Sequence, residues 1–205
     1  MRRTLVQLLV MATRANSGYA KNNAISKQQI MFSSPAISVA NINDIPELLR
    51  LINSAYRGDA ARKGWTHEAD LISGNIRIDA SSLSDSIQSS NAVILKYLNE
   101  LKEITGCVYL QKQDDNLYLG MLSVSPDTQG SGAGKQLLKA ATEYAKQLKC
   151  TSIVMTVISV RHKLIAWYER NGYYKTGETK PFPADNRFGK PTQPIEFAIL
   201  KKDLN

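Results

Sequence analysis

Apolar residues recur at helical spacing in the first part of the chain's body. The apolar stripe consists of Ile45, Leu48, Leu49, Ile52 and Ala55. Asn43 or Asp44 can cap its start, and Pro46 lies near its first turn. This pattern predicts a helix that ends near Tyr56. Residues 57–78 are polar and irregular, and Asp79 is placed to cap a further helix through about Gln88.

Short segments rich in aliphatic and β-branched residues predict strands at 36–40, 92–98, 104–112 and 117–124. Turn-forming residues join the last three segments, which is typical of an antiparallel meander. Beyond residue 125 the periodicity changes, and strands alternate with helices. The later pattern predicts helices at about 133–148 and 161–171 and strands at 152–158, 173–178 and 195–201. The order indicates an α/β (α+β) fold with a mixed sheet.

Residues 1–34 show no sustained periodicity, so we expect a dispensable or disordered tail, followed by one domain over residues 35–205. The apolar run 5–12 is far shorter than the roughly 20 residues that a membrane-spanning helix needs. The tail resembles a weak secretory signal or an organelle transit peptide, and Met31 is an alternative start of translation. We expect a cytoplasmic protein that does not bind membranes, with organelle targeting as the alternative.

Composition and charge narrow the possible functions. The chain has 205 residues, of which 43% are apolar, and a formal net charge of +8. Five of these charges lie in residues 1–43, which contain no acid, so the remainder is only mildly basic. We therefore expect no nucleic-acid partner, although a nucleic-acid-binding α/β domain would be favoured if the tail charges were functional.

The cysteines and histidines do not form a recognisable reactive or metal-binding pattern. Cys107 and Cys150 are too few for a disulfide framework or a zinc site. His67 and His162 lie outside any metalloprotease or nucleophile–histidine motif. We expect no bound metal.

A glycine-rich loop between a predicted strand and an amphipathic helix is the most informative segment. Its backbone N–H groups at a helix start favour a phosphate. Gln129 and Gln136 stand where a P-loop needs Gly and Ser or Thr, and Lys135 and Leu137 interrupt the dinucleotide-binding spacing. Only the pattern Q-x-x-G-x-G remains.

This pattern, after a strand that ends in Leu122-Ser123-Val124-Ser125-Pro126, resembles the GNAT superfamily of acetyl-CoA-dependent N-acetyltransferases. The resemblance implies a sheet of about seven strands, flanked by about four helices. It also implies that the strand residues Leu122 and Val124 pair with the pantetheine arm of acetyl-CoA. The loop residues implied to bind the cosubstrate are Gln129, Gly130, Ser131, Gly132, Ala133, Gly134 and Lys135.

A second segment, Ala166 to Tyr173, is similar to the A-x-x-Y-E-x-x-G-F/Y segment of the same family. The resemblance implies that Tyr168 protonates the departing thiolate, and that the N–H of Val124 stabilises the oxyanion. Arg161 stands where many members have an Asn that contacts the cosubstrate; Arg161 could instead reach a phosphate or the acceptor. No Glu lies on the strand before the loop, so the general base is unassigned.

The sequence thus predicts direct transfer of an acetyl group to a primary amine of a small molecule or peptide, by a monomer or homodimer. The alternatives are a CoA-binding regulatory module without catalysis and an acyltransferase that uses a longer acyl-CoA. Polar residues expected near the acceptor, some of them candidate bases, are Trp65, Glu68, Asp70, Tyr118, Asp185 and Glu196.

Overall fold

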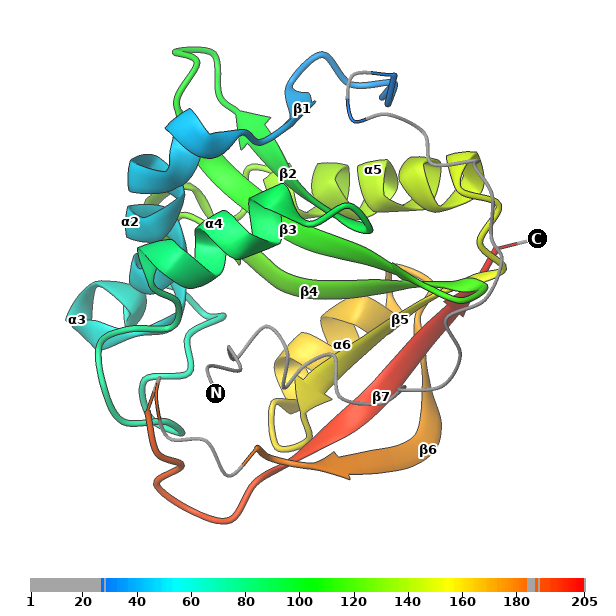
Figure 1. Cartoon of the computed structure of the whole chain (residues 1–205). Helices are drawn as coiled ribbons and strands as arrows, with labels where there is room; N and C mark the ends of the chain where they lie inside the picture. The colour runs from blue at the N-terminus through cyan, green and yellow to red at the C-terminus, as the bar shows by residue number, and fades with distance from the viewer. Residues whose placement is uncertain (1–26, 28, 184–186, 188, 205) are drawn as a thin grey trace.

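Seven strands form one mixed sheet in the computed structural model, which describes residues 27, 29–183, 187 and 189–204 (Figure 1). Their order in space is β1-β2-β3-β4-β5-β7-β6. Only β4 and β5 pair in parallel; all other neighbours are antiparallel. The predicted mixed sheet and meander are confirmed. The strands are β1 Ile37–Val39, β2 Ala92–Leu98, β3 Ile104–Gln113, β4 Asn116–Val124, β5 Ser152–Ile158, β6 Tyr174–Pro181 and β7 Glu196–Asp203.

In the described residues, four helices of eight residues or more flank the sheet, as predicted: α2 Ile45–Tyr56, α4 Ala80–Gln88, α5 Ala133–Gln147 and α6 His162–Glu169. A single-turn helix, α3 Gly58–Ala61, lies in the stretch that the sequence pattern presented as irregular. Two 3-10 turns complete the elements, η1 Ile42–Asp44 and η2 Pro126–Thr128.

The two faces of the sheet carry separate apolar cores because side chains alternate along each strand. Val93 and Leu95 of β2 belong to the core that packs against α5 and α6. Ala92 and Ile94 of the same strand belong to the core under α2 and α4. Figure 1 shows α2 and α4 together on one side of the meander, with α5 on the other.

Strands β4 and β5 pair at one end and then diverge. Their register contains only three pairs, from Asn116↔Ser152 to Tyr118↔Val154. Strand β4 has an irregularity in its pairing with β3 beyond this point, and Met121 adopts a φ of 52° there. Such a bulge bends a strand and increases its twist. The β5-facing edge of the second half of β4 is therefore without a strand partner.

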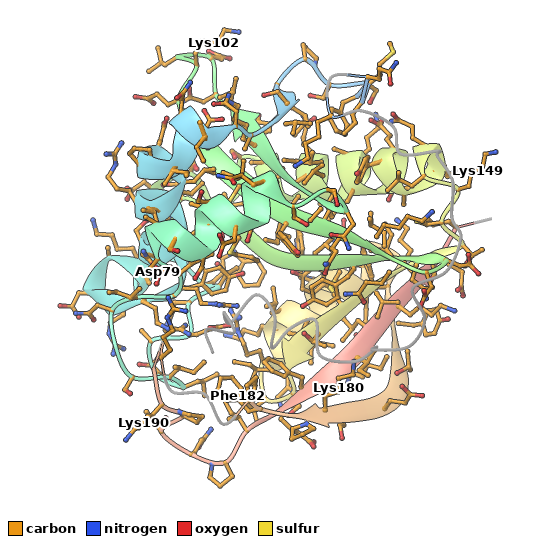
Figure 2. The ribbon with its side chains drawn as sticks, in the orientation of Figure 1. Asp79, Lys102, Lys149, Lys180, Phe182 and Lys190 are labelled. Carbon is orange, nitrogen blue, oxygen red and sulfur yellow. The ribbon has the colours of Figure 1, made fainter. Side chains whose placement is uncertain are left out.

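Three of the lysines labelled in Figure 2, Lys102, Lys149 and Lys190, lie at separate edges of the molecule. Among the helices of the described residues, none has the length and apolarity that a membrane crossing requires.

Candidate active site

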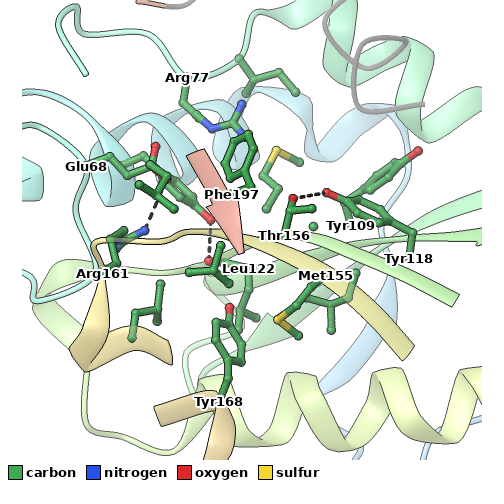
Figure 3. A pocket seen from close by; sticks show the side chains of 18 of the residues that line it. Glu68, Arg77, Tyr109, Tyr118, Leu122, Met155, Thr156, Arg161, Tyr168 and Phe197 are labelled. Atoms are coloured by element: carbon green, nitrogen blue, oxygen red, sulfur yellow. Dashed lines mark hydrogen bonds and ion pairs between the residues drawn. The ribbon is translucent and has the colours of Figure 1, made fainter. Parts of the chain in front are cut away.

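A cavity of about 110 Å³ lies where β4 and β5 diverge, and Figure 3 shows its side chains in close-up. Strand β4 contributes the backbone around Gly120 and Leu122, and β5 contributes the segment 155–158. Residues of α2, of α4 and the segment before it, and of α6 and its N-cap close the cavity: Tyr56, Glu68, Arg77, Ser82, Arg161 and Tyr168. The cavity therefore joins the diverging strands to the segment before α4 and to α6.

The free edge of β4 presents backbone groups to this region. The N–H of Ser125 donates to the Thr105 carbonyl on the β3 side, at 2.9 Å. Successive N–H groups of a strand point in opposite directions, so the N–H of Val124 points away from β3, toward the diverging β5. On the same edge the carbonyl of Leu122 accepts a hydrogen bond from the Tyr56 hydroxyl at 2.9 Å (Figure 3). The Val124 N–H is thus placed to bind a ligand.

The glycine loop leads directly into α5. Gly130 and Gly132 have φ values of 94° and 91°, a region that favours glycine, and a Cβ built on either would meet nothing within 4 Å. Gly132 is the N-cap, and the first-turn N–H groups of α5 have no intrahelical acceptors. The open space beside these donors leaves room for an anionic group such as a phosphate.

The remaining loop residues differ in how they meet this space. A Cβ on Gly134 would make an ordinary van der Waals contact of 3.5 Å with the Trp167 ring, so this position lies where α5 packs against α6. Ala133 is buried, whereas Ser131 and Lys135 are exposed. We infer that the exposed pair can reach a ligand's phosphates with their side chains.

Gln129 directs its side chain away from the loop and toward the segment before α4. Its Oε1 accepts from the Trp65 N–H at 2.9 Å, and its Nε2 donates to the Thr66 hydroxyl at 2.8 Å. A Cβ on Gly64 would lie 2.6 Å from Gln129 Nε2, so only glycine at that position leaves room for this contact. Gln129 therefore links the candidate cosubstrate loop to the candidate acceptor side.

Tyr168 lies on α6, with its ring between those of Trp167 and Tyr173 at 5.0 and 5.8 Å. It is 6% exposed and lines the cavity, into which its hydroxyl points in Figure 3. Burial, reinforced by the nearby Tyr56, raises the pKa of Tyr168 well above the usual value. The hydroxyl therefore keeps its proton at neutral pH and can donate it or a hydrogen bond.

Glu68 forms a buried ionic cluster at the cavity wall. Arg57 Nη1 lies 2.5 Å from Glu68 Oε2, and Arg161 Nη1 lies 3.3 Å from Glu68 Oε1. Burial alone would raise the pKa of Glu68, but Arg57, Arg161 and Arg77 together lower it. Arg161 also donates to the Thr66 carbonyl. This clamp keeps Glu68 ionised and makes it a weak proton acceptor.

The other residues expected near the acceptor are scattered. Tyr118 lines the cavity, and its hydroxyl lies 3.3 Å from Thr156 Oγ1. Trp65 is 48% exposed and meets Trp167 edge-on at 6.2 Å. Asp70 is exposed and pairs with Arg62, and Glu196 is exposed beside the cavity-lining Phe197. Asp185 lies outside the described residues.

Sequence reasoning did not single out six residues with polar side-chain groups that the fold brings to the cavity: Tyr56, Arg77, Ser82, Ser86, Tyr109 and Thr156. Burial raises the pKa of Tyr56 to about 12, and its ring carries the Arg77 guanidinium at 5.5 Å. The sequence could have indicated Tyr56, because this residue ends the apolar stripe of the first helix on its sheet-facing side. No sequence pattern indicated Arg77, because the segment that contains it lacks periodicity.

Comparisons with known proteins agree with this geometry. Residues 47–173 match the family described as "Acetyltransferase (GNAT) family". The chain is similar to human N-acetyltransferase 8B, at 24% identity over 125 residues that cover 58% of this chain and 54% of that protein. The chain thus spans about half the length of this curated relative.

Solved structures show the same fold at low identity. The ribosomal-protein-S18-alanine N-acetyltransferase of Escherichia coli superposes with a TM-score of 0.62 at 15% identity, covering 82% of this chain and 93% of that one. The ribosomal-protein-alanine N-acetyltransferase of Brucella melitensis gives a TM-score of 0.62 at 18% identity, over 82% and 99% of the two chains. From the family match and its site geometry, the chain belongs to the GNAT family of acetyltransferases.

Proposed function

We propose that this protein transfers an acetyl group from acetyl-CoA to a primary amine by direct attack within a ternary complex. The observation that carries the proposal is a cavity lined both by the edge of β4 as far as Leu122 and by Tyr168. The N–H of Val124 lies on the same edge of β4, just beyond this lining. Donors for a carbonyl oxygen and for a departing sulfur would thus lie around one reaction site.

Acetyl-CoA would supply a thioester that is already activated, so the protein needs to align and stabilise and need not form a covalent intermediate. The backbone amides of 129–134 would hold the pyrophosphate, at the helix start where Gly130 and Gly132 leave open space. The edge of β4 at Leu122 and Val124 would bind the pantetheine arm as a neighbouring strand does. The N–H of Val124 would donate to the carbonyl oxygen as negative charge develops.

Tyr168 would assist the departure of the sulfur. The raised pKa of Tyr168 lies far above that of an ordinary thiol, about 8.5. Complete transfer of the proton to a thiolate is therefore unfavourable, and we propose that a short hydrogen bond from Tyr168 provides most of the stabilisation.

The acceptor amine must lose a proton before or during attack. The candidate bases are Glu68, Asp70, Tyr118 and Glu196. Of these, Glu68 and Tyr118 line the cavity. Because Glu68 is held by two guanidinium groups, we favour a relay through water and the hydroxyls of Tyr118 and Thr156.

The test is release of CoA from acetyl-CoA with a panel of primary amines, for wild type and Tyr168→Phe. The substitution keeps the ring and its packing, so affinity for acetyl-CoA measured by calorimetry should stay within about threefold. Because a hydrogen bond to a charged group contributes about 1.5–3 kcal/mol, kcat should fall at least roughly tenfold. Wild-type turnover by the Phe variant, with chemistry rate-limiting, would remove Tyr168 from the mechanism. Binding of acetyl-CoA without turnover of any amine would instead indicate a regulatory module.

A further inference from the structure

Arg77 is a cation that the proposed chemistry does not use. It lines the cavity, and Figure 3 shows its side chain directed toward the cavity from above Phe197. Among the described residues, the ion pairs within 4.0 Å do not include Arg77. Its recorded side-chain contact is the face of the Tyr56 ring, at 5.5 Å. The guanidinium is therefore available to an anion.

The backbone that carries Arg77 is held in place by one side chain of α2. Asn53 Oδ1 accepts from the N–H groups of Arg77 and Ile78, at 2.6 and 3.1 Å, and Asn53 Nδ2 donates to the Ile78 carbonyl at 3.1 Å. Three hydrogen bonds fix this irregular segment to a helix. The position of Arg77 is thus set by the fold.

The electrostatics of the cavity favour an added negative charge. Glu68 is the carboxylate among the described lining residues, and the guanidinium groups of Arg57, Arg161 and Arg77 all act on it. Arg57 and Arg161 contact Glu68 directly, whereas Arg77 does not. One carboxylate thus interacts with three guanidinium groups, and Arg77 is the one of the three that does not contact it.

Ser82 lines the same cavity and is 1% exposed. Its hydroxyl lies beside the carboxylate of Asp79 and helps to lower the pKa of that group, so it already serves an anion of this chain. The Arg77 guanidinium is the group on this wall that is complementary to a further carboxylate.

We propose that the amine acceptor carries a carboxylate, which Arg77 binds. The acceptor class is then an amino acid or an amino-acid conjugate with a free carboxyl group. This inference rests on the proposed acetyl transfer. The carboxylate is the part of the acceptor that is bound and does not react.

The test compares amines that differ only in having a carboxylate or a carboxamide: L-phenylalanine and its amide, and γ-aminobutyrate and its amide. The negative carboxylate raises the pKa of a nearby amine, so the amides have more neutral amine at neutral pH. A preference for the acid therefore cannot come from amine ionisation. We expect kcat/KM to favour the acid by at least about tenfold in one pair or both. Calorimetric binding of the acid and the amide, in the presence of CoA, should show the same preference without turnover.

Arg77→Gln should remove the preference, and Arg77→Lys should restore part of it. Arg50→Gln is the matched control, because it removes the same charge from an exposed position of α2 outside the cavity and should keep the preference. If Arg77→Gln lowers the melting temperature, Arg77→Lys, which keeps the charge, provides the second variant. Equal binding and turnover of acid and amide in both pairs would overturn the carboxylate site, while CoA release would still support acetyl transfer. Acid-selective binding without CoA release would keep the site and remove the proposed transfer.

Discussion

The carboxylate of Glu68 should contribute strongly to the stability of the fold. Breaking a buried ion pair leaves its partners uncompensated, at a cost of about 3–5 kcal/mol. We expect Glu68→Gln to lower the free energy of unfolding by about 3 kcal/mol at neutral pH, as measured by urea denaturation. Asp70→Asn is the control, because Asp70 forms an exposed pair with Arg62 and should cost less than about 1 kcal/mol. Equal losses in the two variants would contradict the buried cluster.

The same residue predicts a dependence on pH. The pKa of Glu68 in the folded protein lies below its usual value of 4.5, so folding favours the charged carboxylate. This contribution to stability is present above pH 4.5 and is lost as pH falls through the folded-state pKa. Denaturation between about pH 5 and 3 should therefore be shallower for Glu68→Gln than for wild type. If the stabilities of the variant and the wild type fall equally with pH, carboxylates other than Glu68 cause the acid unfolding.

Gly132 tests the phosphate-binding loop at the scale of one residue. Gly132→Val should abolish the rise in melting temperature that acetyl-CoA gives the wild type, because a side chain would enter the space beside the α5 donors. The positive φ of 91° also predicts strain in the variant without ligand. Gly177→Val is the matched control: Gly177 has a φ of 88° and open space, but it lies on β6. A retained shift in the Gly132 variant would remove the loop from cosubstrate binding.

At the scale of elements, Gln129 connects the loop before α5 to the segment before α4. Gln129→Ala removes its hydrogen bonds to Trp65 and Thr66 and leaves the loop backbone in place. We expect KM for the amine to rise several-fold and KM for acetyl-CoA to change little, in steady-state assays that vary each substrate. Gln136→Ala, an exposed change on α5, should alter neither value. A rise confined to acetyl-CoA would show that this side chain serves the cosubstrate.

At the scale of the whole molecule, residues before the sheet contact α5. Ile30 and Phe32 pack against a core, and both the N–H and the hydroxyl of Ser33 bond to Glu143. A chain that begins at Met31 loses Ile30 but keeps Phe32 and Ser33, so we expect its melting temperature and acetyl-CoA affinity to stay close to those of the full chain. A chain that begins at Pro35 loses Phe32 and Ser33 and should melt several degrees lower. Equal melting temperatures for the two shortened chains would place the domain boundary after residue 34, as the sequence predicts.

Periodicity predicted the long helices and most of the strands because these elements bury a face or stripe, whereas β6 is exposed along its whole length. The glycine loop was predictable because its glycines serve local geometry. The divergence of β4 from β5 was not, since it depends on a bulge at Met121, a residue with no preference for positive φ. Arg77 was also missed, because side-chain bonds from distant Asn53 position it and leave no pattern in the neighbouring sequence.

The three-pair junction of β4 and β5 has a further consequence. A strand edge without a partner is a template for pairing with another chain, and proteins ordinarily keep such edges at the margin of a sheet. Here the edge is internal, and the proposed cosubstrate would cover it. Acetyl-CoA would then act as a folding ligand as well as a reactant. The fraction of chains protected from aggregation would follow the acetyl-CoA supply of the cell by mass action.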